Sequence, residues 1–564
     1  MPYHAVSETA VSAPGKVLLT GGYLVLDRQY TGTVFALDAR IHVVVRQLQR
    51  EKGKGKRKGK GSKEAVARAL RREEDEVEDG GGGDTMMGED RAGKAFDGGQ
   101  GVDDGDGDEE AAAAAADEII VVKSPQFVDA VWEYGIRREP DGGGVRVVQN
   151  GDGPPNPFIE TALNYALTYI SYVSASKLFG SFSVTILADN DYYSQTTASQ
   201  VTGSNKGTRF VHFGVKLDEA HKTGLGSSAA LVTALVSAIV IHRTIEPGEL
   251  PMIRDKLHNL AQIAHCAAQG KVGSGFDIAA AVYGSCLYRR FSPTVLDNLG
   301  DVGSPQFEER LFSVVEDLNP EQPWDTECAD YGIKLPRGMQ MVLCDVDCGS
   351  QTPGMVKKVL QWRENNREEA DALWMELQQN NDKLRLQLKA LRHNKANNGN
   401  SRTASAVVST DNNIYNNNNN EEEEDEEDEE DDENVNVNVN KRKDFDAVGK
   451  IISRSRALLR TMTAKSGVPI EPKVQTELLD RLSSEVEGVI GGVVPGAGGY
   501  DAIALLVRDD AAVVDRLRAF LRTWKSSVED DFGGKIERVR LLGVAHGSEG
   551  LRCEIPAHYY GWMV

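Results

Sequence analysis

The segment Lys222-Thr-Gly-Leu-Gly-Ser-Ser-Ala-Ala230 places a lysine, two glycines and two hydroxyl side chains directly before a small, apolar run, 229–241, that predicts a helix. Glycines let the backbone approach a phosphate closely, and the free N–H groups and dipole of a helix N-terminus favour an anion. Lys222 adds a positive charge, and the serines add hydroxyl donors or ligands for a phosphate-bound Mg²⁺. This pattern predicts a nucleotide-phosphate site.

Two other segments carry charged residues beside glycines. Lys16 follows Pro14-Gly15, which predicts a turn that could project the lysine into a cleft, although an ordinary surface lysine fits the segment as well. Asp277 lies in the glycine-rich stretch Gly270–Ser285 and has two compatible interpretations. It could cap a helix expected at 278–283, or act beside the phosphate loop as base, orienter or metal partner.

The hydrophobic pattern around these residues predicts the elements that must position them. Up to residue 335 it indicates helices over 157–170 and 252–268 and a strand over 182–187. Beyond residue 335 it indicates strands over 339–346 and 539–544, helices from near 354 and over 474–482 and 510–524, and two strand pieces within 489–507. The second part is therefore expected to be a smaller α+β domain with an antiparallel sheet.

Two low-complexity segments inflate the 564-residue length, which is otherwise that of a two-domain enzyme. Residues of about 51–117 are rich in glycine and charged residues, and about 395–443 contain an asparagine run and the acidic block 421–433. Neither has the apolar periodicity to bury a core, so we expect disordered insertions. The acidic block supplies more than half of the net charge of −22, which therefore says little about function.

Composition also limits the partners. The net charge gives no footprint for nucleic acid. The lysine-rich start of the first insertion could contact an acidic partner, although a solvated loop is the more ordinary interpretation. The longest apolar run is too short to span a bilayer, and the N-terminus lacks the apolar region of a signal peptide, so we expect no membrane. The six cysteines lack a second metal-ligand pair, which favours reduced thiols and a cytoplasmic location.

Three separated segments, Ser12–Tyr23, Lys222–Ala230 and Pro495–Asp501, resemble the three signature motifs of the GHMP small-molecule kinases and occur in the same order. Within that family the chain is similar to the phosphomevalonate kinases of fungi. That similarity rests on the segments 123–127, 270–285, 349–357, 471–480 and 494–502.

The resemblance implies a fold and an activity. The fold is α+β in two domains: 1–335, an N-terminal α/β domain like domain 2 of ribosomal protein S5, and 336–564, a ferredoxin-like C-terminal domain. The activity is transfer of the γ-phosphoryl of ATP, with Mg²⁺, to 5-phosphomevalonate, giving 5-diphosphomevalonate for isoprenoid and sterol synthesis. Monomer and homodimer are both open.

The resemblance also assigns residues. Asp277 and Lys16 would flank the reacting groups, and Ser228 would approach Mg²⁺. The ATP phosphates would be held by Lys222, Gly224, Leu225, Gly226, Ser227, Ser228 and Ala229. The acceptor would be held by Lys271, Ser274, Ser350 and Thr352, and the phosphate loop would be supported by Gly496, Ala497, Gly498 and Gly499.

The acceptor's chemistry refines the role of Asp277. A phosphate monoester has a second pKa of about 6, so it is mostly ionised at neutral pH and needs a strong base less than an alcohol does. Bringing two polyanions together demands cations instead. We therefore expect Asp277 mainly to orient Lys16 and the acceptor.

The chain departs from its family twice. No acid lies between Asp255 and Asp277, where related kinases often carry an acidic Mg²⁺ ligand, and Asp347-Cys348 precedes Gly349 where Lys-Gly is common. Mevalonate kinase, diphosphomevalonate decarboxylase and a non-catalytic ligand sensor are the alternatives; the sensor would be expected to have lost Lys16, Asp277 or the serine pair.

Overall fold

The computed structural model describes residues 8–48, 118–174, 179–194, 209–329, 333–347, 354–393 and 434–563, with only the backbone for 393 and 434–444. The chain forms two compact units. The first comprises Met1–Val17, Val34–Gly332 and Gly547–Val564, and the second comprises Leu18–Thr33 and Ile333–His546. The expected domains were 1–335 and 336–564. In the structure Leu18–Thr33 and residues 333–335 belong to the second unit, and Gly547–Val564 belongs to the first.

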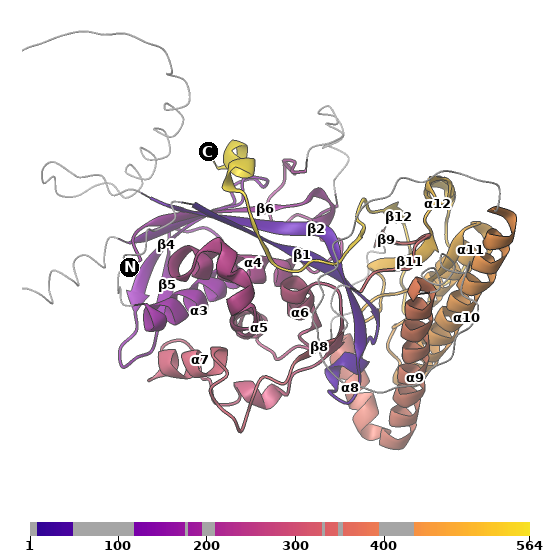
Figure 1. Cartoon of the computed structure of the whole chain (residues 1–564), viewed down its shortest axis with the longest axis horizontal. Helices are drawn as coiled ribbons and strands as arrows, with labels where there is room; N and C mark the ends of the chain where they lie inside the picture. Colours follow the sequence, from indigo (N-terminus) through magenta and orange to yellow (C-terminus); the bar gives the residue numbers. More distant parts are fainter. Residues whose placement is uncertain are drawn as a thin grey trace, which may run out of the picture. The chain divides into compact units, whose positions relative to one another are not determined.

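A ten-stranded sheet forms one layer of the first unit (Figure 1). Its main path runs β14-β1-β2-β6-β3-β4-β5, in which β3 and β6 pair in parallel. The bounds are β1 Glu8–Thr20, β2 Gly32–Gln47, β3 Ile119–Lys123, β4 Val131–Arg138, β5 Val145–Asn150, β6 Phe182–Ala188, β7 Cys286–Arg289, β8 Glu327–Ala329, β13 His546–Gly547 and β14 Arg552–Glu554. Because β14 pairs with β1, opposing Glu554 to Ala10, the end of the chain joins the first unit.

Helices cover one face of this sheet in Figure 1. They are α3 Pro157–Val173, α4 Ser227–Thr244, α5 Arg254–Gln269, α6 Phe276–Tyr283 and α7 Phe307–Val315, with 3-10 turns at Asn190–Tyr192, Pro247–Ile253, Pro293–Leu296 and Pro556–Trp562. In the described part of the chain, α4 is the one helix long and apolar enough for a membrane span, but 72% of it is buried inside the protein. Both α3 and α5 pack against it, as expected for a core helix.

The second unit contains a four-stranded antiparallel sheet in the order β10-β11-β9-β12. The strands are β9 Met339–Asp347, β10 Val489–Val493, β11 Ala502–Arg508 and β12 Arg538–Leu541. The helices are α8 Met355–Asn365, α9 Arg367–His393, α10 Asn434–Ser466, α11 Lys473–Glu485 and α12 Ala511–Thr523. One core joins this sheet to α11 and α12, and includes Leu479, Leu505 and Leu517.

A second core of this unit draws in the segment Leu18–Thr33, which holds the 3-10 turn Leu24–Leu26. The ring of Tyr30 packs edge-on against Trp374 of α9 at 5.7 Å. The guanidinium of Arg363 lies 3.9 Å over the same indole and pairs with Asp27 at 2.8 Å. These contacts explain why Leu18–Thr33 belongs to the second unit.

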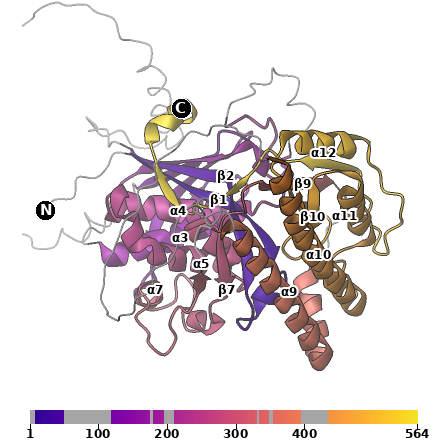
Figure 2. The same cartoon turned by 45° about the vertical axis from the view of Figure 1, so that its right-hand side comes forward.

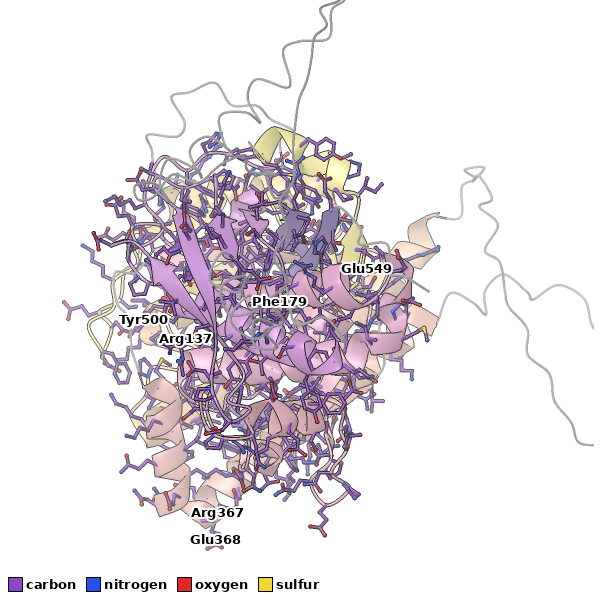
Figure 3. The ribbon with its side chains drawn as sticks, turned by 90° about the vertical axis from the view of Figure 1, so that its left-hand side faces the viewer. Arg137, Phe179, Arg367, Glu368, Tyr500 and Glu549 are labelled. Carbon is purple, nitrogen blue, oxygen red and sulfur yellow. The ribbon has the colours of Figure 1, made fainter. Side chains whose placement is uncertain are left out.

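The long helices α9 and α10 lie side by side (Figures 1 and 2) and are absent from the sequence expectations. Figure 3 labels Arg367 and Glu368, which begin α9; Glu368 suits the positive end of the helix dipole, and Arg367 pairs with Asp371 at 2.7 Å. The insertion expected at 51–117 lies outside the described residues, as does most of that at 395–443. Residues 434–443 instead form the start of α10, since extending an existing helix costs little.

The expected turn at Pro14-Gly15 is also wrong, because both residues lie inside β1. The other expected elements are present, with ends that shift by a few residues. Among the described cysteines, Cys266, Cys286, Cys328, Cys344 and Cys553 are free thiols, as expected.

Candidate functional site

The loop before α4 has the backbone geometry of an anion-binding turn. Gly224 and Gly226 both take left-handed conformations, with φ of 75° and 83°. Gly226 is the N-cap of α4 and no side chain caps the helix, so the first N–H groups of α4 keep their capacity to bind an anion. Ser227 and Ser228 form the first turn of that helix, half-buried, with Leu225 and Ala229 packed into the core beside them.

Lys16 lies against this loop because β1 runs directly past it. Its N–H donates to the carbonyl of Leu225 at 2.9 Å, and its Nζ donates to the carbonyl of Gly224 at 3.3 Å. A Cβ on Gly15 would lie 3.0 Å from the Leu225 carbonyl, so the approach of strand to loop requires glycine there. The first and second signature segments therefore meet in the first unit.

Asp277 is the second residue of α6, whose N-cap is Gly275, so the interpretation of Asp277 as the cap is wrong. A left-handed Gly275, φ 83°, begins the helix two residues earlier than expected. One carboxylate oxygen of Asp277 accepts from the N–H of Ile278 at 3.0 Å, and the side chain is about a quarter exposed. Its charge acts on Lys16: burial lowers the pKa of the Lys16 ammonium, and the Asp277 carboxylate opposes that shift.

The sequence expectations missed His265, on α5. Its side chain is 3% exposed; its Nε2 lies 3.2 Å from Ser228 Oγ and its Nδ1 lies 3.9 Å from an Asp277 carboxylate oxygen. Burial lowers the pKa of His265, Asp277 acts against that shift and the charge of Lys271 reinforces it. The available signal was the run of polar side chains on the buried face of α5, namely His258, Asn259, Gln262 and His265.

The remaining residues expected in the first unit lie near this cluster but are more exposed. Lys222 is exposed and its backbone forms an isolated bridge to Tyr193. Lys271 is exposed just after the end of α5. Ser274 is half-buried, and its carbonyl accepts from the Tyr288 hydroxyl at 2.7 Å. Ser350 and Thr352, expected to hold the acceptor, lie outside the described residues.

The third signature segment folds in the second unit as a loop rich in left-handed glycines. Gly496, Gly498 and Gly499 have φ of 67°, 78° and 103°. The N–H of Gly499 donates to the Ile470 carbonyl at 3.0 Å, and a Cβ on Gly498 would clash with that carbonyl. The Tyr23 hydroxyl, from the end of the first signature segment, donates to the Ala497 carbonyl at 2.7 Å. The first and third segments therefore also meet.

The donor set fits a magnesium ion that is held mainly by phosphates and water. Within the described ranges, no three His, Cys, Asp or Glu side chains gather as a metal site. Ser228 offers a hard hydroxyl oxygen at the mouth of the loop. Mg²⁺ usually keeps several waters and binds through one or two protein oxygens together with substrate phosphates, and this arrangement allows that coordination.

Comparison with known proteins agrees with the signature segments. Residues 198–285 match the model of the GHMP kinases N terminal domain, and residues 437–525 match that of the GHMP kinases C terminal domain. Over 98% of both chains, the sequence is 58% identical to a phosphomevalonate kinase of Aspergillus fumigatus and 39% identical to one of Gibberella zeae. A Lin0012 protein from Listeria innocua shares the fold, with a TM-score of 0.50 and 14% identity over 95% of this chain and 99% of that one.

Proposed function

The chain belongs to the GHMP kinases, on their phosphomevalonate kinase branch, and from that membership we propose that it transfers the γ-phosphoryl of MgATP to 5-phosphomevalonate. The products are 5-diphosphomevalonate and ADP, on the route to isoprenoids and sterols. The observation that carries the proposal is 58% identity over essentially the whole of both chains. The cluster of Lys16, Asp277 and the glycine loop supports it.

In this proposal the first unit supplies the ATP side of the reaction. The N–H groups of the loop and of the first turn of α4 bind the ATP phosphates, and Lys222 adds charge at the edge. Ser228 contributes one oxygen to Mg²⁺, which supplies charge neutralisation of the phosphates when bound. Lys271 and Ser274 serve the acceptor, together with Ser350 and Thr352.

Lys16 and Asp277 act on the reacting phosphates. The acceptor phosphate is already mostly ionised at neutral pH, so the principal cost is repulsion between the acceptor and the ATP phosphates. Burial makes the Lys16 ammonium effective in a low-dielectric site, and Asp277 helps to keep it protonated there. Asp277 therefore works mainly as an orienting group.

The test of the reaction is ADP release by the purified chain with MgATP and, separately, mevalonate, 5-phosphomevalonate and 5-diphosphomevalonate. We expect turnover only with 5-phosphomevalonate. Turnover with mevalonate would keep the kinase assignment and overturn the acceptor, whereas CO₂ and phosphate release from 5-diphosphomevalonate would identify a decarboxylase. Binding of an acceptor without turnover of any would favour the ligand sensor.

The role of Asp277 has its own test. In Asp277→Asn the amide keeps the size and one acceptor oxygen but loses the charge, so we expect kcat to fall by about 10²- to 10³-fold, less than removal of an essential base would cost. Single-turnover rates and acceptor affinity are the measurements. A loss of about 10⁴-fold or more with unchanged acceptor affinity would show that Asp277 is an essential base.

We also propose a cytoplasmic protein, a monomer or homodimer, that uses small molecules and neither nucleic acid nor membrane. The free thiols of the described cysteines are consistent with a reducing compartment. Fractionation of cells that express the full chain tests the location. Light scattering after size exclusion distinguishes monomer from dimer.

A further inference from the structure

His265 connects two groups of the site that come from different helices. Ser228 begins α4, His265 lies near the end of α5 and Asp277 begins α6, so the imidazole stands between a hydroxyl and a carboxylate. It is 3% exposed, its Nε2 is 3.2 Å from Ser228 Oγ and its Nδ1 is 3.9 Å from Asp277. A buried ring with both nitrogens facing polar site groups is well placed to orient them.

A fourth residue determines which ring nitrogen carries the proton. The amide nitrogen of Gln269, one helical turn along α5, lies 3.0 Å from the same Nε2. An amide nitrogen only donates, so Nε2 must accept, and a neutral imidazole then carries its proton on Nδ1. That N–H faces the Asp277 carboxylate, whose negative charge favours the same tautomer.

This proton arrangement dictates how Ser228 is used. Because Nε2 carries no proton in this tautomer, the hydrogen bond between it and Ser228 is donated by the hydroxyl, which shares the Nε2 lone pair with the Gln269 amide. The Ser228 proton then points into the protein. The lone pairs of Ser228 Oγ are then directed away from the imidazole. A hydroxyl that ligates a cation needs this orientation, since its proton would otherwise compete with the metal for the same direction.

We propose that His265 is a positioning residue: as the Nδ1-protonated tautomer it accepts a hydrogen bond from the Ser228 hydroxyl, keeps the lone pairs of that oxygen available to Mg²⁺ and presents its Nδ1–H towards Asp277. The inference deepens the proposed function and rests on it for the identity of the bound nucleotide.

The first experiment measures binding rather than turnover. Calorimetry gives the affinity of the full chain for a non-hydrolysable ATP analogue with and without Mg²⁺, for wild type, His265→Phe and His265→Gln. We expect His265→Phe to lose about 10- to 100-fold of the affinity measured with Mg²⁺ and little of that measured without it. His265→Gln should recover part of the loss, because its amide oxygen can accept a hydrogen bond from the serine hydroxyl.

His258→Phe is the matched control. His258 lies on the same helix and is as buried, but it bonds to Asn259 at 3.1 Å and packs on Tyr283 at 5.1 Å. This control should leave both affinities unchanged. Equal losses with and without Mg²⁺ in His265→Phe would show a merely structural role and overturn the proposal, as would an unchanged affinity with Mg²⁺.

A second measurement reports the protonation of the ring directly and needs no nucleotide. Nitrogen NMR of the histidine-labelled wild-type chain reports which ring nitrogen is protonated, and the signal that disappears in His265→Gln identifies the residue. A proton on Nδ1 supports the proposal, and a proton on Nε2 overturns it. Neither experiment depends on the acceptor, so failure of wild-type turnover with 5-phosphomevalonate would count against the proposed function alone.

Discussion

Replacing Gly226 by alanine tests whether the glycine loop holds Lys16 in place. Gly226 has a φ of 83°, and an added Cβ would lie 2.7 Å from Lys16 Cε and 3.3 Å from Lys16 Nζ. Carbon atoms in contact lie about 3.5–4.0 Å apart, so the lysine stem must move by roughly 1 Å. A misplacement of about 1 Å at a catalytic group can cost on the order of 10²-fold in rate, which is the fall in kcat that we expect.

The substitution also strains the backbone, and Gly214→Ala isolates that effect. Gly214 has a φ of 69° and nothing within 4 Å of an added Cβ. A left-handed alanine costs about 1–2 kcal/mol, so each variant should lower Tm by roughly 2–8 °C. Only Gly226→Ala should lose activity, because only that Cβ meets Lys16.

The assay is the initial rate of ADP release with saturating MgATP and 5-phosphomevalonate, well below the Tm of both variants. Thermal unfolding of the same preparations supplies the stability comparison. If kcat of Gly226→Ala stayed within about twofold of Gly214→Ala while Tm fell in both, Lys16 would not depend on the loop for its position, and the reasoning would be refuted.

Three further predictions concern other parts of the chain. Gly498→Ala, in a left-handed loop against a backbone carbonyl, should reduce kcat by about 10-fold or more, while Gly467→Ala, equally left-handed with open space, should not. Deleting 51–117 and closing the gap with a short Gly-Ser linker should leave kcat unchanged. The N–H of Leu48 donates to the Ser181 carbonyl at 2.9 Å and the N–H of Ile119 donates to the Ser181 hydroxyl at 3.1 Å, so a short linker can join the two ends. Glu554→Gln should lose less stability than wild type as the pH falls through 4.5 and below.

The sign of the last prediction follows from the shifted pKa. Burial raises the pKa of Glu554, but hydrogen bonds from Ser12 and Arg552 outweigh it and hold that pKa below the ordinary 4.5. The resulting stability is present above 4.5 and disappears as the pH falls through the lower folded value. Equal acid sensitivity in chemical unfolding of wild type and Glu554→Gln would contradict this account.

The predictions for Gly498→Ala and for the deletion of 51–117 can also be contradicted by experiment. Similar kinetics for the Gly498 and Gly467 variants would mean that the third loop does not affect the reaction. A correctly folded deletion of 51–117 that lost turnover would show that the segment takes part in activity and is more than a solvated connection.

Local pattern was enough to predict the elements beside the site. Apolar residues at three- and four-residue spacing predicted α3 and α5, and glycines followed by hydroxyls predicted the loop before α4. These features depend on neighbours a few residues apart, so they can be read from a single chain. The same spacing occurs in α9, at the buried Ala370, Leu373 and Leu377, and the sequence expectations overlooked it.

What the sequence determined by itself was therefore the family and the order of its signature segments, and the chemistry of Lys16 and Asp277 stays a prediction. Only the tertiary structure decided that Leu18–Thr33 joins the second unit and that His265 stands between Ser228 and Asp277. Those relations join elements far apart in the chain. They are set by how strands and helices pack, which periodicity and spacing within one segment do not encode.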